Sequence, residues 1–156
     1  MDESEVEYAG FWIRAGATLI DTVLIMVITA PLLAAIYGWK YFGAGSATFI
    51  AGPADFLISW VLPAAAVIWF WTHKKATPGK MALHLRIVDA DTGGSLSLGQ
   101  SIGRYFAYFL SIIPFGLGLI WVAFDSRKQG WHDKLARTVV IRDKKRGTEP
   151  VKFPKT

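Results

Sequence analysis

AGATLIDTVLIMVITAPLLAAIY (residues 15–37) is an apolar run of 23 residues that contains a single charged side chain, Asp21. As an α-helix this run reaches about 35 Å, which is enough to cross a hydrocarbon core of about 30 Å. The start of the chain, MDESEVE, is acidic, whereas a signal peptide begins with basic residues and has a shorter apolar core. We therefore predict that this segment is a retained transmembrane helix.

Two more apolar stretches lie further along the chain. Residues 54–72 carry one charge, Asp55, at their edge, and residues 105–124 carry none. The 156-residue chain is 53% hydrophobic and only 19% charged, which is apolar for a soluble domain. We therefore predict one all-α integral membrane domain over residues 8–142, with about three transmembrane helices. The predicted spans are 14–38, 54–72 and 98–125.

Basic side chains gather in two parts of the chain. Residues 73–101 hold four Lys and Arg, and the stretch from Asp125 onward holds ten, whereas residues 38–55 hold one Lys. Since basic residues concentrate on the cytoplasmic side of membrane proteins, we expect a multi-pass protein of the plasma (inner) membrane. The N-terminus, the 73–101 loop and the tail are expected in the cytoplasm. Residues 143–156 are predicted to be a basic, disordered tail that lies beside anionic lipid and does not bind nucleic acid.

The third apolar stretch raises a topological question, because both of its flanks are expected in the cytoplasm. From Arg104 to Asp125 there are 22 residues, too few for two full crossings, and Pro114 interrupts them. A straight span and a bent, re-entrant pair of short helices both fit this length. Segments 83–89 and 138–142 read as strands, and a lone strand is rarely stable, so we expect them to pair in the cytoplasm. That pairing favours the bent, re-entrant form.

Two charges in the first span need partners. Arg14 and Asp21 are seven residues apart, so they lie on one face of the helix with Thr18 between them. A central aspartate costs about 2.5–3.5 kcal/mol on insertion, so Asp21 is expected to face protein or water. Arg104 and Tyr108 share one face of the third stretch, and we predict a network that joins them to Asp21 and Thr18. Such a network fits both a purely structural ion pair and a site for a cation or proton.

Two further motifs carry polar groups. TPGK (77–80) predicts a turn after the second span, with Lys80 facing lipid headgroups, because the upstream glycine of a nucleotide-binding loop is missing. His132 and Asp133 adjoin a basic cluster, but they form neither a metal-ligand pattern nor a catalytic constellation. We therefore expect no enzyme activity, no cofactor and no metal.

Three stretches belong together: GFWIRAGATLID (10–21), ATPGKMALHLRIVDADTGGSLSLGQSIGRYF (76–106) and WVAFDSRKQGWHDKLARTVVIR (121–142). In combination they resemble the RDD family of small membrane proteins over residues 8–142. The family is named for one arginine and two aspartates, and the resemblance places these at Arg14, Asp21 and Asp133. It implies a bacterial-type integral membrane protein. Transport has been proposed for the family, including exchange of sodium or another cation for protons.

Our leading expectation is a transporter or cation/proton exchanger component that uses an intramembrane aspartate. Asp21 is expected to bind a monovalent cation or proton, Arg14 and Arg104 to supply opposite charge, and Asp133 to act from the cytoplasmic side. The secondary candidates are Thr18, Lys80, Tyr108 and His132. Because three short spans are few for a transport pathway, we expect a homo-oligomer within the lipid bilayer. The alternative is a non-transporting membrane scaffold or accessory subunit whose Arg and Asp residues are structural.

Overall fold

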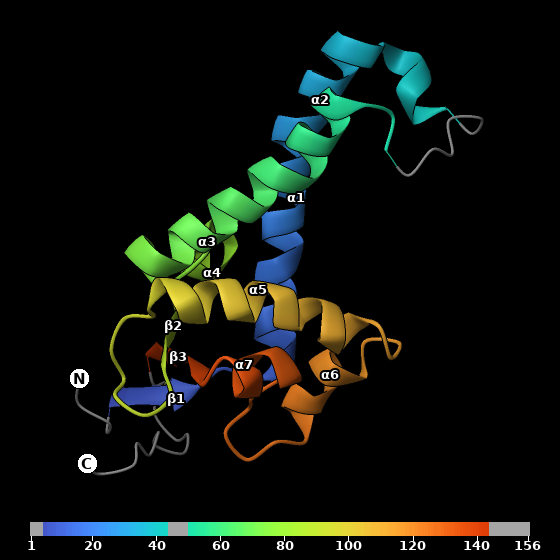
Figure 1. Ribbon diagram of the computed structural model, residues 1–156. Helices are drawn as coiled ribbons and strands as arrows, with labels where there is room; N and C mark the ends of the chain where they lie inside the picture. The colour runs from blue at the N-terminus through green and yellow to red at the C-terminus, as the bar shows by residue number, and fades with distance from the viewer. Residues whose placement is uncertain (1–4, 44–49, 144–156) are drawn as a thin grey trace.

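The computed structural model describes residues 5–43 and 50–143, which form a mostly helical protein with one small sheet (Figure 1). Its longest element is α1 (Phe11–Tyr37), a 27-residue helix that contains Pro31. The helix ends at Gly38, which adopts φ 72° and donates its N–H to the Ala34 carbonyl at 2.9 Å. Glycine suits this position because a side chain disfavours a positive φ.

The second long helix runs from Pro53 to Lys74 and changes its hydrogen bonding on the way. It consists of α2 (Pro53–Phe56), the π-helical segment η3 (Leu57–Val61) and α3 (Leu62–Lys74). Pro63 lacks the N–H that a regular helical turn needs, which accounts for a π-turn directly before it.

Both long helices have the length and apolar composition of membrane spans. These candidate spans are Phe11–Tyr37 and Pro53–Lys74. Only 11% of the most apolar 18-residue segment of each helix is buried within the protein. Figure 1 shows that α1 and α3 rise together away from the sheet. Two candidate spans are thus present close to their predicted bounds, or three if the bent third stretch is counted.

The third apolar stretch is bent, as the Pro114 signal predicted. It consists of α5 (Leu98–Ile112), α6 (Leu117–Ile120) and the short 3-10 helix η4 (Trp121–Ala123), with a 111° bend at the break between α5 and α6. Phe115 and Gly116 adopt positive φ values of 54° and 73°, which reverse the chain direction after Pro114. In Figure 1, α5 runs across the sheet-proximal part of α1 instead of alongside it.

The polar side of α5 faces inward. Its buried residues are Ser101, Arg104, Ala107 and Ser111, whereas Phe106, Leu110 and Ile112 are among its exposed side chains. Ser97 begins the helix with a capping box in which its hydroxyl accepts the Gln100 N–H. This arrangement inverts the pattern of a helix in a soluble protein, and it brings a charged side chain into the interior.

A three-stranded antiparallel sheet in the order β1-β3-β2 closes one end of the molecule. β2 (Leu85–Asp89) pairs with β3 (Thr138–Asp143), which confirms the predicted pairing. The prediction of an all-α fold with two strands missed β1 (Val6–Tyr8), because three residues beside acidic neighbours carry little strand signal. Asp143 belongs to β3 and not to the predicted tail, whose remaining residues 144–156 lie outside the described part of the chain.

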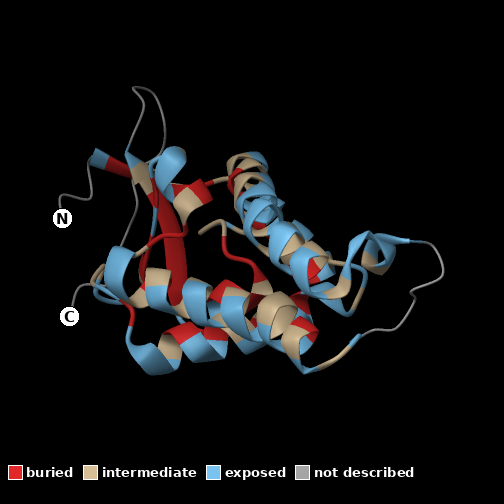
Figure 2. Ribbon diagram, turned by 90° about the horizontal axis from the view of Figure 1, so that it is seen from above, coloured by how far each residue is buried: buried red, intermediate tan, exposed pale blue. Residues whose placement is uncertain are grey.

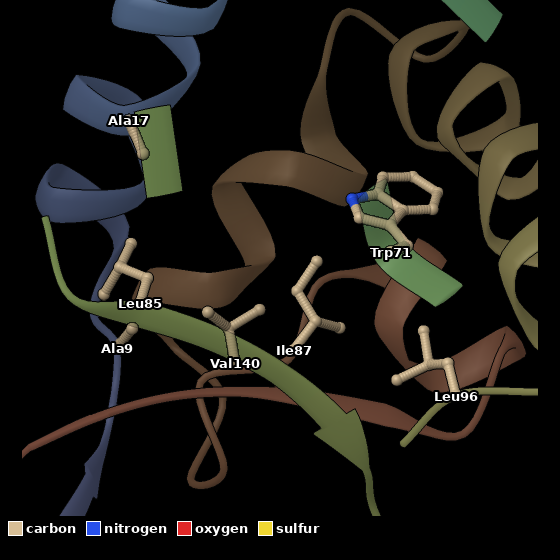
Figure 3. Packing of buried hydrophobic residues seen from close by; sticks show 7 residues of the cluster. All are labelled: Ala9, Ala17, Trp71, Leu85, Ile87, Leu96 and Val140. Carbon is tan, nitrogen blue, oxygen red and sulfur yellow. The ribbon is translucent and has the colours of Figure 1, made fainter. Parts of the chain in front are cut away.

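The hydrophobic core lies between this sheet and the helices. Figure 3 shows its main cluster, in which Leu85, Ile87 and Val140 of the sheet face Ala17 of α1 and Trp71 of α3. Figure 2 shows the buried residues concentrated around the sheet, whereas the far parts of the long helices are exposed. The remaining short elements are η2 (Trp39–Phe42), α4 (Pro78–Ala82) and α7 (Trp131–Leu135).

Candidate functional site

Asp133 lies between two arginines in the interior. Its Oδ2 atom is 2.5 Å from Arg14 Nη1, and its Oδ1 atom is 2.6 Å from Arg104 Nη2. The side chains of Asp133 and Arg104 are completely buried, and that of Arg14 is 9% exposed. One carboxylate thus holds α7 against both α1 and α5, and we call these three residues the Arg–Asp–Arg cluster.

Both arginines of the Arg–Asp–Arg cluster have further contacts. Arg14 donates from Nε to the Ala9 carbonyl at 2.9 Å and from Nη2 to the Lys128 carbonyl at 2.5 Å. Arg104 donates to the Thr138 hydroxyl, and its guanidinium lies 5.3 Å from the Trp71 ring and 5.8 Å from the Tyr108 ring. These contacts fix both guanidinium planes, and charge-assisted hydrogen bonds of this kind are among the stronger ones in proteins.

The Arg–Asp–Arg cluster keeps its carboxylate ionised. Burial alone raises the pKa of Asp133, but the Arg104 and Arg14 guanidiniums outweigh it and hold that pKa below its usual range. The Gly130 N–H also donates to Asp133 at 2.9 Å. Asp133 is therefore a fixed charge at neutral pH and not a group that exchanges protons there.

His132 lies next to the cluster and is neutral. Its ring stacks on Tyr108 with 3.8 Å between centroids, and its backbone N–H donates to the Ser111 hydroxyl at 3.1 Å. Burial lowers the pKa of His132 to about 3, and the nearby Arg104 and Arg14 charges act in the same direction. The stack therefore joins α7 to α5 through a neutral imidazole.

We expect acid to destabilise the protein through His132. Between pH 6.5 and 3 the unfolded histidine binds a proton that the folded one does not, so stability falls as the pH falls. The slope reaches at most about 1.4 kcal/mol per pH unit. His132→Phe, which can still stack on Tyr108, should flatten this slope in thermal unfolding measured across that pH range in detergent. Equal slopes in the variant and the wild type would contradict this assignment.

Asp21 has different partners from those predicted. It accepts hydrogen bonds from the Thr77 hydroxyl at 2.5 Å and from the Gly79 N–H at 2.7 Å. The predicted pairing with Arg104 was wrong, because that guanidinium is held by Asp133 instead. Asp21 thus links α1 to the turn between α3 and α4, and it does not belong to the Arg–Asp–Arg cluster.

Gly79 allows this close contact between α4 and α1. A Cβ atom at Gly79 would collide with the Ala17 carbonyl and would lie 2.9 Å from Cγ of Asp21. The TPGK motif is therefore a docking element for the first helix, a role that the sequence did not indicate.

Lys80 is buried, although the sequence predicted that it faces lipid headgroups. It is 5% exposed, and its Nζ lies 3.5 Å from the Thr77 hydroxyl. Within residues 5–43 and 50–143 it forms no ion pair. Lys80 contributes to a pocket of about 540 Å³, as do the other secondary candidates. The pocket is lined by Phe11, Arg14, Ala15, Thr18, Leu19, Thr22, Lys80, Tyr108, Ile112, Gly116, Leu119, Ile120, Val122 and His132.

A second buried carboxylate, Asp55, was not among the predicted site residues. It accepts hydrogen bonds from the Tyr41 hydroxyl at 2.8 Å, the Ser59 hydroxyl at 2.7 Å and the Ala51 N–H at 2.7 Å. Its position just after Gly52 and Pro53, at a helix start, was the available signal. Asp55 holds the start of the second long helix.

Two or three candidate membrane spans, a small sheet and the Arg–Asp–Arg cluster define a small helical protein of the membrane type. The model of the RDD family matches residues 8–137, so the chain belongs to the RDD family. The chain is 32% identical to the uncharacterised protein YxaI of Bacillus subtilis, over 85% of this chain and 96% of that protein. It is 30% identical to the uncharacterised membrane protein YteJ of Bacillus subtilis, over 88% of this chain and 82% of that protein. No solved structure matches the chain.

Proposed function

We propose that this protein is a membrane transporter or cation/proton exchanger component in which Asp21 is the group that responds to the ion. The proposal has no enzymatic step. The observation that carries it is the placement of a half-buried carboxylate within the 27-residue apolar helix α1. Ionisable groups inside membrane spans are costly and commonly mark ion or proton paths.

The hydrogen bonds of Asp21 provide a way to couple ion binding to movement. The ionised carboxylate accepts the Thr77 hydroxyl and the Gly79 N–H, both from the segment that follows α3. A proton or cation on that carboxylate competes with these donors. Release of the donors frees α4 from α1 and so changes the contact between the first helix and the segment after the second.

We propose a topology in which the protein lies in the plasma membrane and its sheet lies in the cytoplasm. Support comes from the basic residues of the 73–101 loop and of the stretch after Asp125. The shared sheet requires β1, β2 and β3 to lie on one side, which favours a re-entrant third stretch. A homo-oligomer is part of the proposal, since two crossing helices in one copy enclose little space.

Ion flux into proteoliposomes tests the proposal. The purified chain is reconstituted with an internal pH-sensitive dye, and sodium, potassium and pH gradients are imposed in turn. We expect flux with the wild type and background flux with Asp21→Asn, a neutral isostere that can still accept the Gly79 N–H. Asp55→Asn is the matched control, because it removes a hydrogen-bonded carboxylate from the other candidate span. It should keep flux, provided that both variants remain monodisperse.

The second candidate function is a scaffold or accessory subunit that transports nothing. The Arg–Asp–Arg cluster favours it, because Asp133 is fully buried and joins three helices as a structural ion pair does. Wild-type vesicles without flux under every gradient would reject transport and support this reading.

A further inference from the structure

The pocket between α1, α5 and α6 has two chemically different kinds of lining. Arg14 of α1 and Lys80 of α4 provide cationic groups, whereas Leu19, Leu119 and Ile120 are apolar. Its volume of about 540 Å³ falls within the range of small-molecule sites, which is roughly 300–1,000 Å³. The pocket therefore suits an amphipathic ligand better than a bare ion.

The charge of the pocket selects an anion. Its described lining includes two cations and no carboxylate. Of these two, Arg14 is paired with Asp133, whereas Lys80 forms no ion pair among the described residues.

Lys80 has hydrogen-bonding capacity to spare. An ammonium group carries three N–H donors, and the Thr77 hydroxyl at 3.5 Å is a weak acceptor for one of them. A buried cation without an ion pair is costly, so an anion that reaches Lys80 gains more than it does at an exposed lysine.

The apolar part of the pocket continues into exposed apolar surface. Leu19 of α1 is 66% exposed, and Ile112 of α5 is 53% exposed, and both line the pocket. Because α1 is a candidate membrane span, a lipid chain can enter from the side without crossing water. A small soluble anion would gain nothing from contact with these apolar side chains.

We propose that this pocket binds one anionic phospholipid, with its phosphate at Lys80 and an acyl chain against the wall formed by α1, α5 and α6. The site is distinct from Asp21, which does not line the pocket. The lipid phosphate supplies the negative charge that the buried Lys80 lacks among the described residues. This assignment does not depend on ion flux, since a scaffold and a transporter would bind the lipid alike.

Native mass spectrometry of the detergent-purified chain tests the proposal. The protein is titrated with dioleoylphosphatidylglycerol or with dioleoylphosphatidylcholine, which differ in charge and share acyl chains. We expect the wild type to prefer phosphatidylglycerol, and Lys80→Met to weaken that binding on the order of tenfold, the effect of one charged hydrogen bond. Lys74→Met removes an exposed lysine and should leave the preference intact. Since Lys80 forms no ion pair in the described chain, its loss should not unfold the protein.

A second variant probes the apolar wall. Ala15 is exposed and lines the pocket, so Ala15→Trp should fill it and weaken phosphatidylglycerol binding while keeping Lys80. Equal binding of the two lipids by the wild type would overturn the proposal. So would an equal loss of preference in Lys74→Met, which would show general attraction to a basic surface. Displacement of the lipid by millimolar inorganic phosphate, together with no effect of Ala15→Trp, would show a small-anion site instead.

Discussion

Asp133→Asn should sharply lower the fraction of the protein that is folded. The substitution leaves the Arg14 and Arg104 guanidiniums buried without a carboxylate, and such a break costs about 3–5 kcal/mol. This loss is a large share of the total free energy of unfolding of a domain of this length. We expect a sharp drop in the monodisperse fraction on size-exclusion chromatography and a much lower unfolding temperature in detergent.

The control for this prediction is the exposed ion pair at the edge of the sheet. Arg86 and Asp143 are 3.3 Å apart, with side chains 50% and 62% exposed. Asp143→Asn should therefore change stability by less than about 1 kcal/mol. If Asp133→Asn and Asp143→Asn unfold at the same temperature, the Arg–Asp–Arg cluster does not hold the fold together.

Gly79→Ala should separate α4 from α1. The new methyl group meets the Ala17 backbone carbonyl, which cannot rotate away as a side chain can, and it crowds the Asp21 carboxylate. Overpacking of this kind costs about 1–3 kcal/mol, and the loss of the Gly79 hydrogen bond to Asp21 adds to it. Thermal unfolding should show a clear loss of stability.

Gly103→Ala is the matched change in open space. A Cβ atom at Gly103 meets nothing within 4 Å, and alanine is favoured over glycine in a helix by up to about 1 kcal/mol. Gly103→Ala in α5 should therefore be neutral or stabilising. An equal effect of both substitutions would mean that the contact between α4 and α1 contributes nothing.

The parts of the fold that could be predicted are those that local composition determines. The apolar runs indicated α1 and the second long helix, and Pro114 indicated the bend. The alternating segments indicated that β2 pairs with β3. β1 escaped prediction because its order comes from pairing with β3 and not from its own three residues.

The partners of the charged residues could not be predicted in the same way. Arg14, Asp21, Arg104 and Asp133 were all identified as important, but the sequence does not say which charge meets which. Asp21 was assigned to Arg104 from shared helix faces, and α5 instead turns that side chain toward α7. The burial of Lys80 was missed for a related reason, because it follows from the glycine contact of α4 with α1.

The pairing of Arg14 with Asp133 has a consequence for synthesis at the ribosome, because 119 positions separate the two residues. At 5–20 residues per second, the carboxylate emerges roughly 6–24 s after the guanidinium. The Arg104 guanidinium also has no carboxylate partner until Asp133 is translated. A nascent chain that stops after α5 therefore carries two guanidiniums without their carboxylate, and the Arg–Asp–Arg cluster can form only after α7 has been translated.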